Sequence, residues 1–209
     1  HWRTKPATGC LYRTMQRNRL SILDGESERI ARAANGDLRA FDELVHQHYS
    51  LAYSLAYKVL GEEDDAREIT QDAFVRIHRA LGSFRGDASL KTWIMRIAMR
   101  LSLNRRRDRS RSTWHRLGLH GSETATHAST PAHQTPEGEY ISREVRAHVR
   151  AQIDGLPEPL RQVLILNSFE DLSYEEIAQI LDLPIGTVSS RLHAARKKLL
   201  HQFEKSDLL

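Results

Sequence analysis

The sequence has almost no cysteine and no long apolar segment. Its 209 residues include a single cysteine, Cys10, which excludes an intramolecular disulfide framework and a cysteine-rich zinc module. Glycine and proline number 11 and 6, too few for a fibrous or generally disordered chain. No apolar run is long enough to cross a bilayer, and the N-terminus lacks the apolar core of a signal peptide. We therefore expect a cytoplasmic protein without membrane insertion.

The net charge is only +4, but the charges are segregated along the chain. Residues 62–72 hold six carboxylates and one arginine, a local balance of 1 − 6 = −5. Residues 85–116 hold ten lysines or arginines and two aspartates, a balance of 10 − 2 = +8. Such polarity offers one surface to a cationic partner and another to a polyanion, although two solvated helix faces would show the same composition.

Apolar residues recur at three- and four-residue spacing through most of the chain, which predicts helices. One series runs from Leu38 to Leu60 and stops at Gly61, a residue typical of helix C-termini. A second series begins in the acidic turn that follows, and a third starts at Leu90 and runs into the arginines at 105–107. No stretch alternates with period two, so we expect no sheet. The predicted fold class is all-α.

A polar segment divides the chain into two parts. Between His120 and Gly138 there is no Leu, Ile, Val, Phe or Met, so this segment buries too little apolar surface to offset its ordering entropy. We predict two small helical domains joined by a flexible linker. The expected boundaries are a mobile N-terminal extension at 1–27, a first domain at 28–107, the linker at 108–138, a second domain at 139–203 and a C-terminal tail at 204–209.

The second domain contains a pattern typical of a helix-turn-helix. Ser173 and Glu176 have the spacing of a capping box at the start of one short helix. Residues 182–186 break that helix, and a basic helix is expected to start at Thr187. The second helix of such a motif enters the major groove, where its first side chains reach base edges and later cations contact phosphates. An ordinary helical hairpin with a basic surface is the alternative.

In the first domain, cations alternate with aromatic residues between Phe84 and Arg107. This combination suits single-stranded nucleic acid, because bases stack on aromatic rings while cations attract the backbone. The loop at residues 86–89 is polar and narrow, as a pocket for an extruded base would be. Trp93 also belongs to the apolar series of its helix, however, and a core position is the more frequent place for such a residue.

Two blocks of the sequence closely resemble one known family. The first block is similar to region 2 of the extracytoplasmic-function (ECF) sigma factors of the sigma-70 family in the segments Ile69–Phe74, Phe84–Ile94 and Arg96–Ala98. The second block is similar to region 4 of the same family in the segments Leu156–Val163, Ser173–Ala178 and Gly186–Arg191. The blocks occur in the family's order, with a linker between them and without regions 1.1 and 3.

The resemblance implies a transcription initiation factor that directs core RNA polymerase to stress- or signal-responsive promoters and helps to melt them, without catalytic activity, cofactor or metal. Region 4 would also bind the β flap, and an anti-sigma factor would hold the protein inactive. The β′ clamp helices would be bound by Asp65, Glu68, Gln71, Asp72 and Phe74. The −10 element, including a flipped base, would be contacted by Arg85, Asp87, Ser89, Lys91, Trp93, Arg96, Arg100, Asn104 and Arg105. The −35 element would be contacted by Tyr174, Glu175, Thr187, Ser189, Ser190, Arg191, His193, Arg196 and Lys197.

The sequence departs from the family at Arg100, where many members carry asparagine, and this exchange would strengthen phosphate contact. Two other functions would each explain part of the sequence. A zinc site would draw on four histidines in the polar segment, but they lack cysteine or a rigid helix to fix their geometry; they are His115, His120, His127 and His133. A stand-alone helix-turn-helix regulator would explain the second domain only, and no long heptad offers it a dimer interface.

Overall fold

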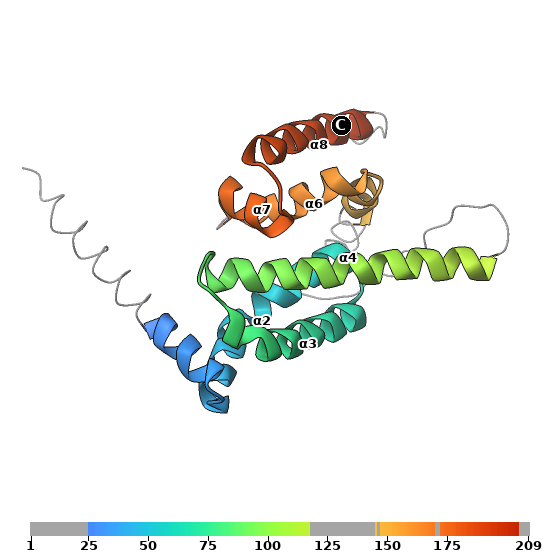
Figure 1. Ribbon diagram of the computed structural model, residues 1–209. Coiled ribbons are helices and arrows are strands. Elements are labelled where there is room, and N and C mark those ends of the chain that lie inside the picture. Colours follow the sequence, from blue (N-terminus) through green and yellow to red (C-terminus); the bar gives the residue numbers. More distant parts are fainter. Residues whose placement is uncertain (1–24, 118–144, 146, 170–171, 205–209) are drawn as a thin grey trace, which may run out of the picture.

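The chain is helical wherever the structure gives it a regular element. The structure, a computed structural model, describes residues 25–117, 145, 147–169 and 172–204 (Figure 1). Within these ranges there is no strand, which confirms the all-α prediction. The elements are a helix over residues 25–34, α2 (Leu38–Leu60), α3 (Glu63–Ala80), the short 3₁₀ helix η1 (Leu81–Ser83), α4 (Leu90–Leu117), a helix over 147–154, α6 (Glu158–Asn167), α7 (Tyr174–Leu181) and α8 (Ile185–Glu204).

Local sequence fixes both ends of α2. At its start, the Asp37 carboxylate accepts hydrogen bonds from the backbone N–H groups of Arg39 and Ala40, at 3.0 and 3.1 Å. At its end, Gly61 adopts a left-handed φ of 79° and donates its N–H to the carbonyl of Tyr57. Glycine takes this conformation without steric cost. The Asp and Gly signals in the sequence therefore correspond to the observed cap and stop.

The first domain is a bundle in which α2, α3 and α4 pack against one another. Its core consists of apolar side chains from all three helices that are almost fully buried, among them Leu55, Ile77, Ile94 and Met95. The positions follow the three- and four-residue spacing of the sequence, because that spacing places them on one face of each helix.

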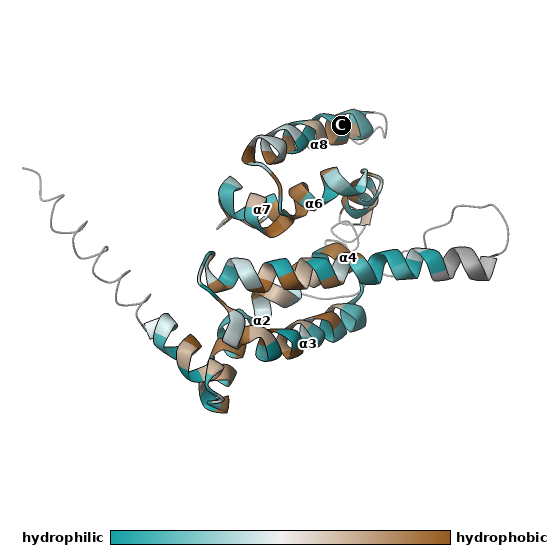
Figure 2. Ribbon diagram, in the orientation of Figure 1, coloured by the Kyte–Doolittle hydropathy of each residue, from teal (hydrophilic) through white to brown (hydrophobic). Residues whose placement is uncertain are grey.

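Helix α4 is longer than expected and continues to Leu117 instead of ending at Arg107. The predicted linker at 108–138 is thus wrong for its first ten residues, 108 to 117. Apolar periodicity does not reveal this extension, whose first turn is joined to α3 by an ion pair between Arg109 and Asp65 at 2.6 Å. In Figure 2 the ribbon of α4 is coloured mostly hydrophilic in the turns just before its grey end. Residues 118–138 lie outside the described residues.

The other predicted boundaries fall mostly outside the described residues. Residues 25–27, assigned to the N-terminal extension, already belong to the helix over 25–34, whereas residues 1–24 are not described. Glu204, assigned to the C-terminal tail, is the last residue of α8. The remainder of that tail and the start of the predicted second domain, residues 139–144, are not described either.

The second domain contains the predicted helix-turn-helix. Ser173 and Glu176 form both bonds of the capping box: Ser173 Oγ accepts from the Glu176 N–H at 3.2 Å, and the Ser173 N–H donates to Glu176 Oε2 at 2.9 Å. Helix α7 ends at Asp182 in a left-handed conformation with φ 55°. Helix α8 begins at Ile185 rather than at Thr187. The core between α6, α7 and α8 holds Val163, Leu166, Ile177, Val188 and Leu192.

The two domains touch each other. Helix α4 lies between α2 and α3 on one side and α7 on the other, and α6 contacts α2 (Figure 1). Buried apolar residues of both domains form one continuous cluster. The sequence predicts two domains held together by a linker alone, and periodicity gives no sign of this contact because it depends on residues that are far apart in the chain.

Polar groups join the domains at the C-terminal end of α2. Asp154 accepts from Arg106 Nη2 and from Arg150 Nε, each at 2.9 Å. Arg150 also donates to the carbonyl oxygen of Lys58 at 2.8 Å, and Lys58 Nζ donates to Ser168 Oγ at 2.9 Å. We call Lys58, Arg106, Arg150 and Asp154 the interdomain cluster.

The charges of this cluster compensate for its partial burial. Burial alone would raise the pKa of Asp154, but the two adjacent guanidinium groups outweigh it and hold that pKa below its ordinary value. Arg106 Nη1 also donates to the carbonyl oxygen of Val59 at 2.8 Å. The last carbonyl groups of a helix have no partner inside the helix, and cations there can bond to them. The cluster therefore caps the C-terminal end of α2 and also joins the domains.

Candidate nucleic-acid and polymerase interfaces

The arginines of α4 divide into groups that face different neighbours. Arg105 forms ion pairs with Asp65 and Glu68 of α3, and Arg109 pairs with Asp65. The sequence prediction assigns Arg105 to the −10 element and the two carboxylates to core polymerase. In the structure Arg105 and Arg109 together offset the charges of Asp65 and Glu68 and tie α4 to α3. Arg106 belongs to the interdomain cluster.

A second group of arginines forms an exposed stripe along α4. Arg96, Arg100, Arg107 and Arg111 are all exposed, at successive intervals of four, seven and four residues. These intervals place them on one face of a helix. No carboxylate pairs with any of the four among the described side chains, and Arg107 bonds only within its own helix, to Asn104 Oδ1 at 2.9 Å and to the Leu103 carbonyl. We call these four residues the arginine stripe.

The sequence prediction includes two members of the arginine stripe and misses the other two. The sequence prediction counts Arg107 among the cations between Phe84 and Arg107 but not among the −10 residues, and it puts Arg111 in the linker, where no helical spacing is expected. The seven-residue interval from Arg100 to Arg107 returns to the same helix face. It indicates a shared surface only if α4 is known to continue past Arg107. Asn104, predicted for the −10 element, is exposed and lies next to this face.

The loop before α4 presents its polar side chains to solvent. Arg85 and Asp87 are exposed. Ser89 caps α4, because its Oγ accepts from the Thr92 N–H at 3.1 Å. The ring of Phe84 packs on that of Trp93, with centroids 5.1 Å apart and planes inclined by 44°. Trp93 is half-buried, so one part of its ring supports the loop and the other is accessible. Lys91, also predicted here, is half-buried.

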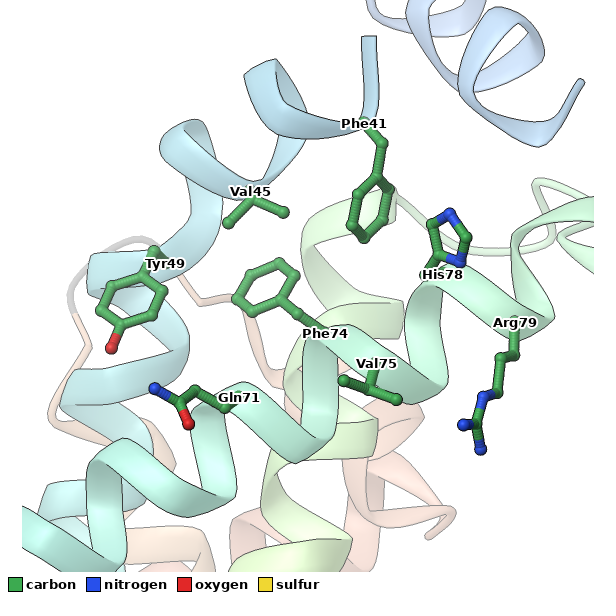
Figure 3. Close-up of a pocket in the computed structure, with 8 residues that line it drawn as sticks. All are labelled: Phe41, Val45, Tyr49, Gln71, Phe74, Val75, His78 and Arg79. Atoms are coloured by element: carbon green, nitrogen blue, oxygen red, sulfur yellow. The ribbon is translucent and has the colours of Figure 1, made fainter. Parts of the chain in front are cut away.

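An apolar groove of about 500 Å³ lies between α2 and α3. Figure 3 shows Phe41, Val45 and Tyr49 from α2 opposite five residues of α3. The lining residues of α3 are Gln71, Phe74, Val75, His78 and Arg79. The Phe74 ring stacks against that of Tyr49 at 6.2 Å, and Phe41 meets His78 edge to face at 4.7 Å.

The groove combines residues that the sequence prediction names with residues that it misses. Phe74 is buried, at 7% exposure, in the floor of the groove, whereas Val75 is 49% exposed. Gln71 and Asp72 are exposed on α3. Val75 could have been noticed, because it is a large apolar residue outside the core series of α3. The contribution of α2 could not, because it depends on how the two helices pack.

Helix α8 presents a polar face to solvent. Its exposed residues include Ser189, Ser190, His193, Arg196 and Lys197, all predicted for the −35 element. Thr187 and Arg191 are half-buried, and Ser190 Oγ donates to the Thr187 carbonyl at 3.1 Å. At the start of α7, Tyr174 is half-buried and Glu175 is exposed. Hydrogen bonds from its own backbone N–H and from Ser173 lower the pKa of Glu175.

Comparison with known proteins gives the same two blocks. Family models described as Sigma-70 region 2 and Sigma-70, region 4 match residues 44–112 and 146–199. The RNA polymerase sigma-H factor of Pseudomonas aeruginosa is 35% identical, with 83% of this chain and 91% of that protein covered. The chain belongs to the ECF sigma factors. The ECF sigma factor SigW of Bacillus subtilis is 32% identical, with 84% of this chain and 95% of SigW covered.

Solved structures agree with the fold of this ECF sigma factor. CnrH, solved in complex with the cytosolic domain of CnrY, is 25% identical with a TM-score of 0.59, over 85% of this chain and 96% of CnrH. RpoE of Bartonella quintana, solved with the anti-sigma factor NepR, has the same TM-score at 22% identity, over 80% of this chain and 98% of that one. At 22% identity, the likeness to RpoE shows a shared fold only.

The described part of this ECF sigma factor contains neither a cluster of metal ligands nor a membrane-spanning helix. Among the described residues, no three His, Cys, Asp or Glu side chains are grouped as metal ligands would be. Of the four histidines considered for zinc, His120, His127 and His133 lie outside the described residues, and nothing is described of the His115 side chain. No helix in the described part has the length and apolarity needed to span a bilayer.

Proposed function

We propose that this ECF sigma factor binds core RNA polymerase in the cytoplasm and directs it to promoters that carry a −10 and a −35 element, without catalytic activity of its own. One observation carries the proposal: three exposed surfaces of different chemistry occur on one chain. They are the apolar groove beside Gln71 and Asp72, the arginine face of α4, and the polar face of α8.

The groove suits a helix of core polymerase at the β′ clamp. Its floor is apolar and aromatic, which gives area for burial, and protein interfaces draw much of their affinity from such anchors. Asp72, which follows the lining residue Gln71 on α3, offers an exposed carboxylate to a basic partner. Asp65 and Glu68 would act at this surface through Arg105, by fixing α3 against α4. Binding of the β flap by region 4 follows from the family alone.

The −10 element would be contacted by the loop at 85–89 and the exposed face of α4. Arg85 and Asp87 are free to approach an extruded base, and Trp93 offers a partly accessible ring on which a base can stack. Arg96 and Arg100 supply phosphate contacts. The −35 element would be contacted by α8 in the major groove, where the exposed Arg196 in the middle of the helix can bond base edges.

The protein would be regulated by an anti-sigma factor. CnrH, whose structure was solved with CnrY bound, resembles this chain over most of its length. An anti-sigma factor that covers the groove between α2 and α3 would compete directly with core polymerase.

Reconstitution with bacterial core RNA polymerase tests the proposal. We expect a stoichiometric complex that starts transcripts at a defined set of promoters from a genomic pool. Asp72→Lys should abolish the complex, because it reverses the charge of an exposed carboxylate next to the lining residue Gln71 on α3. Glu43→Lys is the control with the same charge change, since Glu43 is an exposed carboxylate on α2 outside the residues predicted to bind core polymerase. If no complex formed while the free protein bound duplex DNA, a stand-alone regulator would be supported instead.

A further inference from the structure

We propose that the helix over residues 25–34 is a pH-sensitive strap. It docks on α2 while His48 is neutral, and it is released when His48 takes up a proton. We call this helix the strap. The proposal concerns the free chain and adds a regulatory device to the first domain.

One face of the strap packs against the first domain. Ala33 is buried, and Ile30 packs on the apolar core. Glu26 and Arg29 are half-buried, and the spacing of these four residues places them on the same helix face. At this face Glu26 Oε1 lies 3.5 Å from His48 Nε2 of α2. The docked strap therefore covers the His48 side chain.

His48 is a polar residue at a core position. It continues the buried series of Ala40, Leu44 and Ala52 on α2, and it is only 6% exposed. In the described part of the chain, His48 Nε2 and Arg29 Nε are buried without a hydrogen-bond partner. A buried polar atom without a partner destabilises the folded state. Stability of the bundle therefore does not explain a histidine here, whereas a titratable contact does.

The surroundings of His48 oppose a positive charge on its ring. The charged groups that act on it are Glu26 and Arg29 of the strap and Lys91 of α4. A proton on His48 would thus place a third cation beside a single carboxylate, in a site closed to water. Burial, the larger effect, and the two cations lower the pKa of His48 below its ordinary value, although Glu26 opposes them.

The sign of the pH effect follows from this arrangement. Once the strap is released, water reaches His48, which then has its ordinary pKa of about 6.5. The docked state has the lower pKa and so binds fewer protons than the released state. Docking is therefore complete well above about pH 6.5 and weakens as the pH falls below that value.

The connection between the strap and α2 allows release without loss of the bundle. Gly36 takes a left-handed φ of 93° in the turn that follows the strap. Asp37 caps α2 through the N–H groups of Arg39 and Ala40, so the start of α2 does not need the strap. The ion pair between Arg32 and Asp37 is 49% and 33% exposed, and such pairs hold weakly.

The switch acts beside the surface predicted for the −10 element. Lys91, a predicted contact of that element, is half-buried, and its charge acts on His48. Release of the strap would leave Lys91 more exposed. This consequence rests on the proposed function, whereas the release itself does not.

Amide hydrogen exchange of the full chain measures the release. The released strap would have only ten residues, and isolated helices shorter than about 12–15 residues are marginal in water, so its amides would exchange. After correction for intrinsic exchange, we expect protection of residues 25–34 to fall severalfold from about pH 7.5 to about pH 5.5, with about tenfold as the limit. Protection of α2 should stay constant.

Variants of two neighbouring histidines separate His48 from general effects of acid. His48→Gln cannot take up a proton and should remove the step in protection. His48→Leu, which suits the apolar series of α2, should also remove it and keeps the test valid if glutamine disturbs the docking. His46→Gln is the matched control and should keep the step, because His46 is exposed on the same helix.

The outcomes distinguish this inference from the proposed function. No step in the wild type, or an equal step in the wild type and both His48 variants, overturns the inference. The assay contains neither polymerase nor DNA, so that result leaves the proposed function standing. Conversely, a step that depends on His48 supports the strap even if no holoenzyme forms.

Discussion

The interdomain cluster permits a quantitative test of the contact between the domains. Asp154→Ala removes the carboxylate shared by Arg106 and Arg150. Breaking a fully buried ion pair costs about 3–5 kcal/mol, and breaking an exposed one costs about 0–1 kcal/mol. The side chains of Asp154 and Arg106 are 33% and 26% exposed, so an intermediate cost of about 2 kcal/mol applies. This shifts the equilibrium between touching and separated domains about 30-fold.

Energy transfer between two dyes measures this shift. Cysteines at exposed positions of α3 and α8, Arg76→Cys and Lys198→Cys, would carry the dyes in a Cys10→Ser background. We expect Asp154→Ala to lower the transfer efficiency. The control is Glu158→Ala, because Glu158 bonds only to Gln162 within α6. Equal transfer in the Asp154 variant and the wild type would refute the role assigned to the cluster.

The same assay has a defined pH dependence. The pKa of Asp154 is lower in the folded protein than in an unfolded chain. Its contribution is therefore complete above the unfolded value of about 3.9 and is lost as the pH falls toward and through the folded value. We expect constant transfer efficiency from about pH 5 to 8 and a decrease below about pH 4. The Asp154→Ala variant should lack the change that this carboxylate causes.

Three further substitutions test local features. Ser173→Ala removes the capping box of α7 and should destabilise the second domain by about 1 kcal/mol in thermal unfolding; an unchanged melting temperature would contradict the assigned cap. Gly61→Ala should cost about 1–3 kcal/mol, because φ is 79° and a Cβ would lie 2.9 Å from Arg150 Nη2. Arg196→Ala should weaken binding to −35 DNA by about 1–3 kcal/mol and leave the affinity for core polymerase unaltered, as titrations of holoenzyme would show.

Those parts of the fold that depend on local chemistry could be predicted from the sequence. Gly61 ends α2 because its conformation requires no neighbour, and Ser173 with Glu176 caps α7 through bonds only three residues apart. The continuation of α4 to Leu117 could not be predicted in this way. It shows no apolar periodicity, and the ion pair that joins it to α3 links Arg109 to Asp65, 44 residues away in the chain.

The candidate interfaces, like the fold, could be predicted from the sequence only in part. The sequence assigns the acidic residues 62–72 and the basic residues 85–116 to two external partners. In the structure part of each charge is used internally, between Asp65, Glu68 and Arg105. The charges that are left over, such as Asp72 and the arginine stripe, are the better candidates for partners, and only the packing of α3 against α4 separates the two groups. The α2 side of the groove likewise requires the packing of α2 and α3.

The contact between the domains also limits the reach of the protein. Two domains that touch, with about 150 described residues in all, form a body roughly 40 Å across. Elements centred about 25 base pairs apart on straight duplex are separated by about 85 Å. Simultaneous contact with both elements and contact between the domains therefore exclude each other. Under the proposed function, only chains with separated domains can bind a complete promoter. Each tenfold excess of chains with touching domains over chains with separated domains therefore lowers the apparent affinity for that promoter about tenfold. The contacts of the interdomain cluster must break before both elements are bound. The free energy needed to break them therefore weakens promoter binding by the same amount.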